Sequence, residues 1–183
     1  MWNLPNNLCL IRILMVPIIV WLLGRPDPAS HHWAAVLFAV AATTDMLDGY
    51  LARRSQQVTQ VGKLLDPLAD KLLVSGALIM LIPLGAAPAW AVFIIIAREL
   101  AVTGLRGAAA CQGCVIQASF AAKYKTTFQI AAALTLMLQN ATLAVNLRHL
   151  GLVLLWLALA LTIWSGVDYF VRFSRVLSSH DAG

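Results

Sequence analysis

Four aspartates lie close together within residues 45–70, in two pairs with helical spacing. Asp45 and Asp48 are three positions apart, so they share one face if their segment is helical. Asp66 and Asp70 are four positions apart and do the same. Carboxylate oxygens suit hard divalent cations such as Mg²⁺ or Mn²⁺, which would offset the repulsion between converging carboxylates. If the two segments form a hairpin, the spacing predicts a site for one or two divalent metal ions.

A purely structural interpretation accounts for only part of this pattern. Asp66 precedes Pro67, which is typical of a helix N-cap followed by proline at the first helical position. That interpretation leaves the other three aspartates without a role. Three small residues between the pairs, Gly49, Ala52 and Gly62, would let a helix or a flat ligand approach the backbone closely.

The composition indicates the kind of chain that carries these aspartates. Hydrophobic residues make up 61% of the sequence and charged residues 11%, whereas a soluble domain has roughly 25% charged residues. We therefore expect an all-α, polytopic membrane protein in which residues 1–183 form a single domain.

Six apolar stretches predict six transmembrane helices, and "PLGAAP" at 83–88 predicts a turn, because its prolines and glycine interrupt an uncharged run. The predicted spans are approximately 8–24, 32–54, 62–82, 89–105, 124–145 and 150–170.

The distribution of basic residues predicts the orientation. If the N-terminus is cytoplasmic and the spans alternate, every Lys and Arg except Arg25 and Arg148 lies at a cytoplasmic helix end. Such a bias is what the positive-inside rule describes, so both termini are expected in the cytoplasm. The net charge of +5 is spread along helix ends and has no soluble module to lie on, which argues against a nucleic-acid partner.

The aspartate segment resembles a known family. Residues 45–70 fit the pattern D-x2-D-G-x2-A-R-x8-G-x3-D-x3-D, which is similar to the signature of the CDP-alcohol phosphotransferases. The fixed positions are Asp45, Asp48, Gly49, Ala52, Arg53, Gly62, Asp66 and Asp70.

This resemblance implies a reaction and roles for the motif residues. Members of the family cleave the pyrophosphate of a CDP-linked lipid, transfer the phosphatidyl group to an alcohol and release CMP. Asp70 would be the general base that takes the proton of the attacking hydroxyl. Two divalent ions, Mg²⁺ or Mn²⁺, would be bound by Asp45, Asp48, Asp66 and Asp70. The CDP site would be formed by Asp48, Gly49, Ala52, Arg53 and Gly62.

The acceptor alcohol must be recognised by other residues. Cations in "IARELAVTGLR" and "AAKYKTTFQ" would suit a phosphorylated acceptor, although any one of them could instead anchor its helix at the membrane surface. These segments, and the opening "LPNNLCLIRI", resemble those of phosphatidylglycerophosphate synthases, with Ala122 in place of a usual Gly and Cys9 in place of a Thr. The residues expected to hold the acceptor phosphate are Arg98, Arg106, Lys123 and Lys125.

The resemblance thus predicts transfer of phosphatidyl from CDP-diacylglycerol to sn-glycerol 3-phosphate. Alternatives within the family are a cardiolipin synthase, whose acceptor is phosphatidylglycerol, and another CDP-alcohol phosphotransferase. A divalent-cation transporter is a more distant alternative. A transporter would distribute acidic groups through the depth of the membrane, whereas the four aspartates are expected at one level near the cytoplasmic face. The family also implies a homodimer that contacts membrane lipids. It would lie in a bacterial inner membrane with its active site facing the cytoplasm.

Overall fold

The chain forms a bundle of helices in which each helix runs antiparallel to the next one along the chain. The computed structural model describes the backbone of residues 4–55, 60–111, 120–139 and 146–180, and the side chains of residues 9–44, 68–109, 124–139 and 146–174. The described residues form helices and turns, with no strand, as predicted. The helices are α1 (Leu4–Leu23), α2 (Pro28–Ser55), α3 (Gln60–Leu81), α4 (Ala89–Cys111), α5 (Phe120–Met137) and α6 (Leu147–His180).

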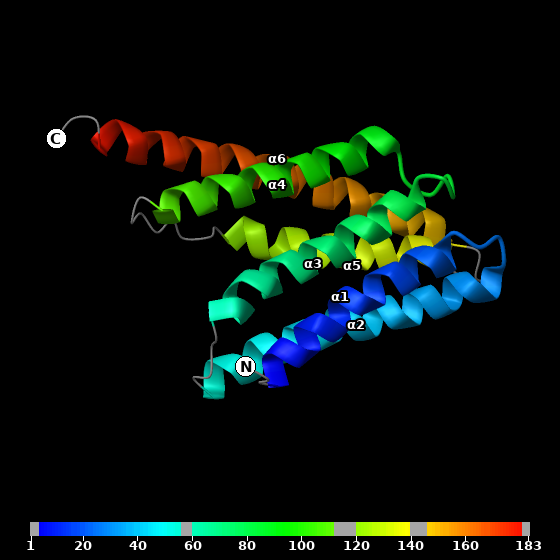
Figure 1. Cartoon of the computed structure of the whole chain (residues 1–183). Helices are drawn as coiled ribbons and strands as arrows, with labels where there is room; N and C mark the ends of the chain where they lie inside the picture. Colours follow the sequence, from blue (N-terminus) through cyan, green and yellow to red (C-terminus); the bar gives the residue numbers. More distant parts are fainter. Residues whose placement is uncertain (1–3, 56–59, 112–119, 140–145, 181–183) are drawn as a thin grey trace.

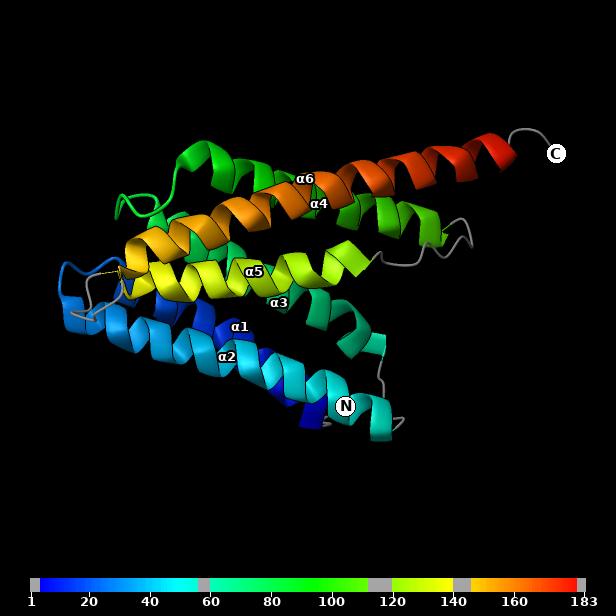
Figure 2. The same ribbon diagram turned by 180° about the vertical axis from the view of Figure 1, so that it is seen from behind.

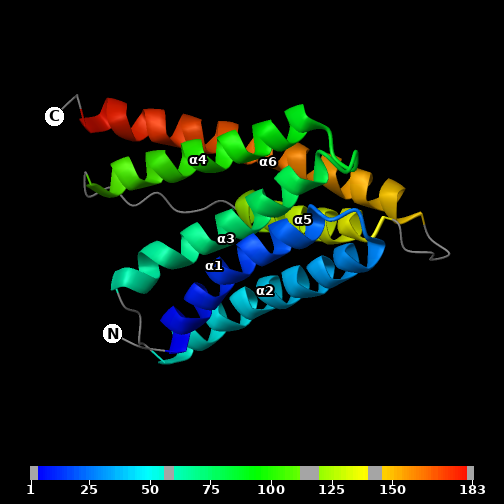
Figure 3. The same cartoon turned by 45° about the vertical axis from the view of Figure 1, so that its right-hand side comes forward.

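The helices are arranged in three pairs (Figure 1). α3 and α5 lie in the middle, with α4 and α6 on one side and α1 and α2 on the other, and the views from behind and after a 45° turn agree (Figures 2 and 3). Helix α1 packs on α2 and α3, while α6 packs on α5 and α4. The core is rich in alanine, which lets helix backbones approach closely.

The first helix begins and the last helix ends at the same end of the bundle. The start of α1 and the end of α6 lie at the end where α2 leads to α3 and α4 leads to α5 (Figure 1). The connections α1–α2 and α3–α4, the end of α5 and the start of α6 lie at the opposite end. This up-and-down order is the one expected for alternating spans that begin and end on one side.

The opposite end is held by helix caps and a tight turn. Asp27 accepts a hydrogen bond from the Ala29 backbone N–H (3.4 Å), which caps α2 just before Pro28. The predicted turn between α3 and α4 is confirmed, and Gly85 adopts a φ of 63° that favours glycine. Arg148 of α6 donates a hydrogen bond to the Gly85 carbonyl oxygen (3.2 Å), which links the start of α6 to the α3–α4 turn.

The helix ends differ from the predicted span ends in three places. α5 ends at Met137, not near residue 145, and the Gln139 N–H then donates to the carbonyl of Leu136, three residues earlier, in a tighter turn. α4 continues to Cys111 and α6 to His180, beyond the predicted ends near 105 and 170. Hydropathy marks where a segment becomes polar, but a helix continues until its backbone is interrupted.

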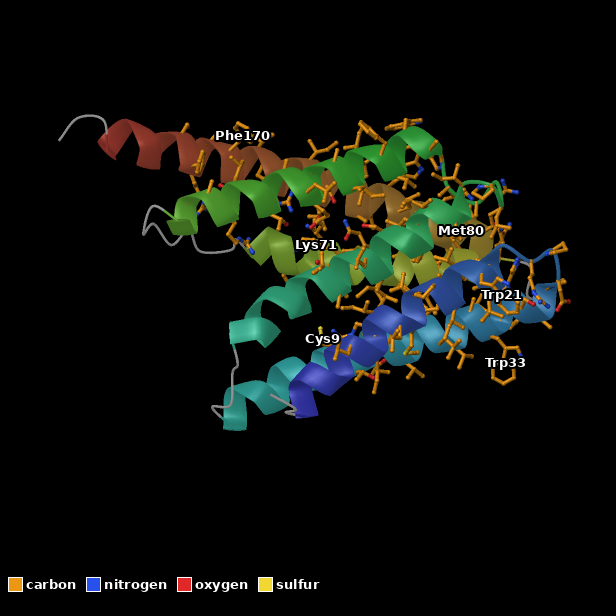
Figure 4. All side chains as sticks on the ribbon, viewed as in Figure 1. Cys9, Trp21, Trp33, Lys71, Met80 and Phe170 are labelled. Atoms are coloured by element: carbon orange, nitrogen blue, oxygen red, sulfur yellow. The ribbon has the colours of Figure 1, made fainter. Side chains whose placement is uncertain are left out.

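One segment of the described chain has both the length and the apolar composition to cross a membrane by itself, Leu147–Ser174 in α6. A shorter apolar segment covers Cys9–Leu23 in α1. Large apolar side chains are nevertheless exposed on several helices, including Phe93 at 71% and Trp164 at 74%. Trp33 points away from the bundle, near Trp21 and the α1–α2 connection (Figure 4). Exposed apolar surface of this extent is typical of a protein that contacts lipid.

Candidate functional site

The predicted site residues fall into two groups. The side chains of Asp70, Arg98, Arg106 and Lys125 are described, and they come from α3, α4 and α5. For the others, the structure describes the helical backbone but not the side chain. These are Asp45, Asp48, Gly49, Ala52 and Arg53 in α2, Gly62 and Asp66 in α3, and Lys123 in α5.

The C-terminal part of α2 and the N-terminal part of α3 lie at the same end of the bundle, as the hairpin hypothesis requires (Figure 1). Among the side chains that the structure describes, no group of three metal-ligating residues is present. Three of the four predicted ligands lie outside those side chains, so the metal site itself remains a prediction.

Glu99 connects two of the predicted phosphate-binding cations. Its Oε1 atom pairs with Nζ of Lys125 on α5 and accepts from Nη1 of Arg98 at 3.5 Å. Lys125 is 3% exposed. A buried ammonium without a counter-ion costs several kcal/mol, at order of magnitude, so Glu99 stabilises Lys125 in its charged form and fixes where it lies.

Arg98 also bridges α4 to α6. Its Nη2 donates to Oγ of Ser165 at 2.9 Å, and its side chain passes over Gly166. A Cβ at Gly166 would lie 3.1 Å from Cγ of Arg98 and 3.5 Å from Nε. Gly166 therefore leaves room for the Arg98 side chain, and the hydrogen bond to Ser165 fixes the position of the Arg98 guanidinium.

Helix α6 presents a polar stripe to the interior of the bundle. Thr162, Ser165 and Tyr169 are three and four positions apart and are 0%, 2% and 5% exposed. Nε2 of Gln129 in α5 donates to Oγ1 of Thr162 at 3.3 Å. The stripe therefore accepts hydrogen bonds from Arg98 of α4 and from Gln129 of α5.

Arg106 lies beside the last residue of this stripe. Its guanidinium carbon is 5.8 Å from the ring centroid of Tyr169, within the range of a cation–π contact. The Tyr169 hydroxyl is buried and has no hydrogen-bond partner among the residues that the structure describes. Arg106 itself is exposed.

Asp70 faces the same interior as Glu99. A pocket of about 20 Å³ opens between α3, α4 and α5, which is room for one water-sized group. Polar side chains contribute much of its wall: Asp70, Lys71, Ser75, Glu99, Thr126 and Gln129. The structure thus brings the predicted general base to the cluster that contains two of the predicted phosphate-binding residues.

A larger hollow of about 600 Å³ lies between α4 and α6. Most of its lining is apolar, from residues such as Phe93, Val102 and Phe170, with Arg98 and Ser174 as polar exceptions. The charged and polar side chains are thus gathered around the smaller pocket.

Sequence reasoning missed several of these residues. Glu99, Ser165, Gln129 and Tyr169 are not among the residues that the sequence predicts for the site. The spacing of Thr162, Ser165 and Tyr169 is the signal that could have found the stripe, because polar residues on one face of an apolar helix require partners.

The comparison with known families identifies the class of protein to which this helical bundle belongs. The family model described as CDP-alcohol phosphatidyltransferase matches residues 2–164, so the chain belongs to this family.

Curated relatives carry more specific names. A protein of Bacillus subtilis named CDP-diacylglycerol–glycerol-3-phosphate 3-phosphatidyltransferase is 44% identical over 184 residues, covering 94% of this chain and 95% of its own length. A protein of the same name from Rickettsia bellii is 39% identical over 92% of this chain and 93% of its own length. A protein of Mycobacterium tuberculosis named probable phosphatidylglycerophosphate synthase is 42% identical, covering 94% of this chain and 82% of its own length.

Proposed function

We propose that this chain transfers the phosphatidyl group of CDP-diacylglycerol to sn-glycerol 3-phosphate, giving phosphatidylglycerophosphate and CMP. The single observation that carries the proposal is the pocket in which Asp70 and Glu99 meet, with Glu99 holding Lys125 and Arg98. A phosphorylated alcohol needs cations to bind its phosphate and a base to take the proton of its hydroxyl, and the interior of the bundle offers both. The printed names of the relatives specify the same donor and acceptor.

The reaction can be written with the groups of the chain. A glycerol hydroxyl oxygen attacks the phosphatidyl phosphorus, its proton passes to a carboxylate oxygen of Asp70, and the pyrophosphate P–O bond breaks with its electron pair on CMP. Arg98, Arg106, Lys123 and Lys125 would hold the phosphate of the acceptor and so orient its hydroxyl toward Asp70. Orientation of this kind removes much of the entropic barrier of a two-substrate reaction.

Divalent metal fits the donor set. Carboxylates are the ligands that Mg²⁺ or Mn²⁺ prefers, and two ions would be held by Asp45, Asp48, Asp66 and Asp70. When bound, such ions neutralise charge on the pyrophosphate and on the departing CMP. Among the residues expected to shape the CDP site, Arg53 would lie near the phosphates and small side chains would make room for the nucleotide. The CDP-binding residues in this proposal are Asp48, Gly49, Ala52, Arg53 and Gly62.

The chain would act as one membrane domain of residues 1–183. In this proposal its six helices span a bacterial inner membrane, with both termini and the active site on the cytoplasmic side. The start of α1 and the end of α6 at the same end of the bundle and the exposed apolar side chains support that arrangement. A homodimer is proposed from the family resemblance.

An acceptor panel tests the function. Purified enzyme in detergent receives CDP-diacylglycerol and Mg²⁺ with glycerol 3-phosphate, phosphatidylglycerol or inositol phosphate, and released CMP is measured. We expect CMP release with glycerol 3-phosphate. Product with phosphatidylglycerol and none with glycerol 3-phosphate would identify a cardiolipin synthase instead.

A further inference from the structure

The Tyr169 hydroxyl has no hydrogen-bond partner within the described part of the structure. Tyr169 is 5% exposed, and its hydroxyl is one of the few buried polar atoms of the described side chains without a hydrogen-bond partner. Buried hydroxyls in folded proteins nearly always have a partner, because an unpaired one loses its hydration without compensation. An unpaired donor in the interior is therefore evidence for a ligand that supplies the acceptor.

The position of Tyr169 indicates which ligand that is. It lies four residues, or about 6 Å along the helix axis, beyond Ser165, which binds Arg98. α4 and α6 lie side by side and run in the same direction (Figures 1 and 2). Arg106 follows Arg98 on α4 and lies over the Tyr169 ring, as Arg98 lies against Gly166.

The polar contacts between α4 and α6 thus form two successive levels. At the first level, the Arg98 guanidinium has an acceptor in the Ser165 hydroxyl. At the second level, the Arg106 guanidinium and the Tyr169 hydroxyl can both donate, and the hydroxyl has no hydrogen-bond partner among the residues that the structure describes. An anion with several oxygens satisfies two neighbouring donors at once.

We propose that the Tyr169 hydroxyl donates a hydrogen bond to a phosphate oxygen of the acceptor, next to Arg106. This inference rests on the proposed function, in which Arg106 belongs to the acceptor-phosphate site. It adds a residue from α6 to a site otherwise assigned to α4 and α5. The same chemistry would suit a phosphate of CDP-diacylglycerol, so the test must vary the two substrates separately.

The variant Tyr169→Phe removes the hydroxyl and keeps the ring beneath Arg106. We expect the KM for glycerol 3-phosphate to rise about tenfold, equivalent to about 1.4 kcal/mol, while the KM for CDP-diacylglycerol stays the same. The melting temperature without substrate should be unchanged or higher, because the buried hydroxyl has no partner to lose. A structural hydroxyl would behave in the opposite way, with a lower melting temperature and unchanged KM values.

Tyr124→Phe is the matched control, since Tyr124 on α5 is 58% exposed and the same oxygen is removed. It should leave both KM values and the melting temperature unchanged. If the rise in KM for Tyr169→Phe is confined to CDP-diacylglycerol, the assignment to the acceptor is wrong. If neither KM changes, the hydroxyl binds no substrate and the inference fails.

A second measurement does not depend on turnover. Inorganic phosphate and glycerol 3-phosphate should raise the melting temperature of the wild-type protein by mass action, and raise that of Tyr169→Phe less. Loss of this difference would overturn the inference. An enzyme that releases no CMP with glycerol 3-phosphate, yet shows the difference with inorganic phosphate, would overturn the proposed function and leave the anion contact of Tyr169 standing.

Discussion

The carboxylate of Glu99 on α4 pairs with the ammonium of Lys125 on α5, and the same oxygen accepts from Arg98 at 3.5 Å. One acidic side chain therefore contacts two cations of the predicted phosphate site. Because Lys125 is buried, it has little freedom to find another partner. Glu99 also lines the pocket that contains Asp70, so the cations and the proposed base are held in one interior.

Replacing Glu99 with Gln should therefore destabilise the protein and weaken acceptor binding. Removal of one partner of a fully buried ion pair costs about 3–5 kcal/mol. Since the Glu99 side chain is 17% exposed, we expect a smaller loss, about 2 kcal/mol. Thermal unfolding in detergent measures the loss, and the KM for glycerol 3-phosphate should rise in the same variant.

Asp168→Asn is the control for this experiment. It breaks the exposed pair between Asp168 and Nε of Arg172 (3.0 Å), one turn apart on α6. Such helix-surface pairs contribute about 0.3–0.5 kcal/mol, so its melting temperature should hardly change. Equal losses in the two variants would show that the Glu99–Lys125 pair is no more important than a surface contact.

The helices could be predicted from the sequence more completely than the site. Apolar runs located all six helices, since burial in lipid or in a core requires such runs. The ends of α4 and α6 were missed because "RGAAAC" and the residues after Phe170 are less apolar but contain no proline, and alanine favours helix. Hydropathy therefore located the helices but not where each one ends.

Pairings within the site could not be predicted in the same way. Glu99 and Lys125 are 26 residues apart and meet only because α4 and α5 have particular rotations about their axes. Those rotations depend on packing, such as that of Gly151 against Leu136. Tyr169 reads in the sequence as one more aromatic residue near a membrane interface, and its unpaired hydroxyl becomes evident only in the folded chain.

Asp70→Asn tests the general base. Asparagine keeps the size of the side chain but cannot accept a proton, so we expect turnover to fall by at least about 100-fold with no loss of expression. CMP release measures turnover, and helix content by circular dichroism measures folding. Asp27→Asn makes the same change at the cap of α2, where asparagine caps equally well, and should be active and stable. Near-normal turnover in Asp70→Asn would exclude the base role.

Chelation of divalent metal should abolish activity without unfolding the bundle. The predicted ions are held by carboxylates and neutralise substrate charge, whereas the described core is apolar and packs without them. We expect EDTA to stop CMP release, Mg²⁺ or Mn²⁺ to restore it, and helix content to stay constant. Full activity in EDTA would contradict the metal assignment of the aspartates.

Gly151→Ala should loosen the packing of α6 on α5. A Cβ there would lie 2.7 Å from Cδ2 of Leu136 and 3.2 Å from its backbone nitrogen. Overpacking of this kind costs about 1–3 kcal/mol. At Gly104 in α4 a Cβ would meet nothing within 4 Å, so Gly104→Ala should be neutral or stabilising by up to about 1 kcal/mol. Melting temperatures that move in the same direction in both variants would contradict the packing argument.

Ser165→Ala removes the acceptor that fixes Arg98. A hydrogen bond to a charged group contributes about 1.5–3 kcal/mol, and part of it should be recovered as Arg98 turns toward Glu99. We therefore expect the KM for glycerol 3-phosphate to rise about tenfold with kcat less affected, because Arg98 positions the acceptor and transfers no proton. Ser165→Thr keeps the hydroxyl and should retain most of the affinity. Ser174→Ala, at an exposed position of the same helix, should behave like the wild type. An unchanged KM in Ser165→Ala would mean that Arg98 reaches its working position without α6, and the acceptor site would then depend on α4 and α5 alone.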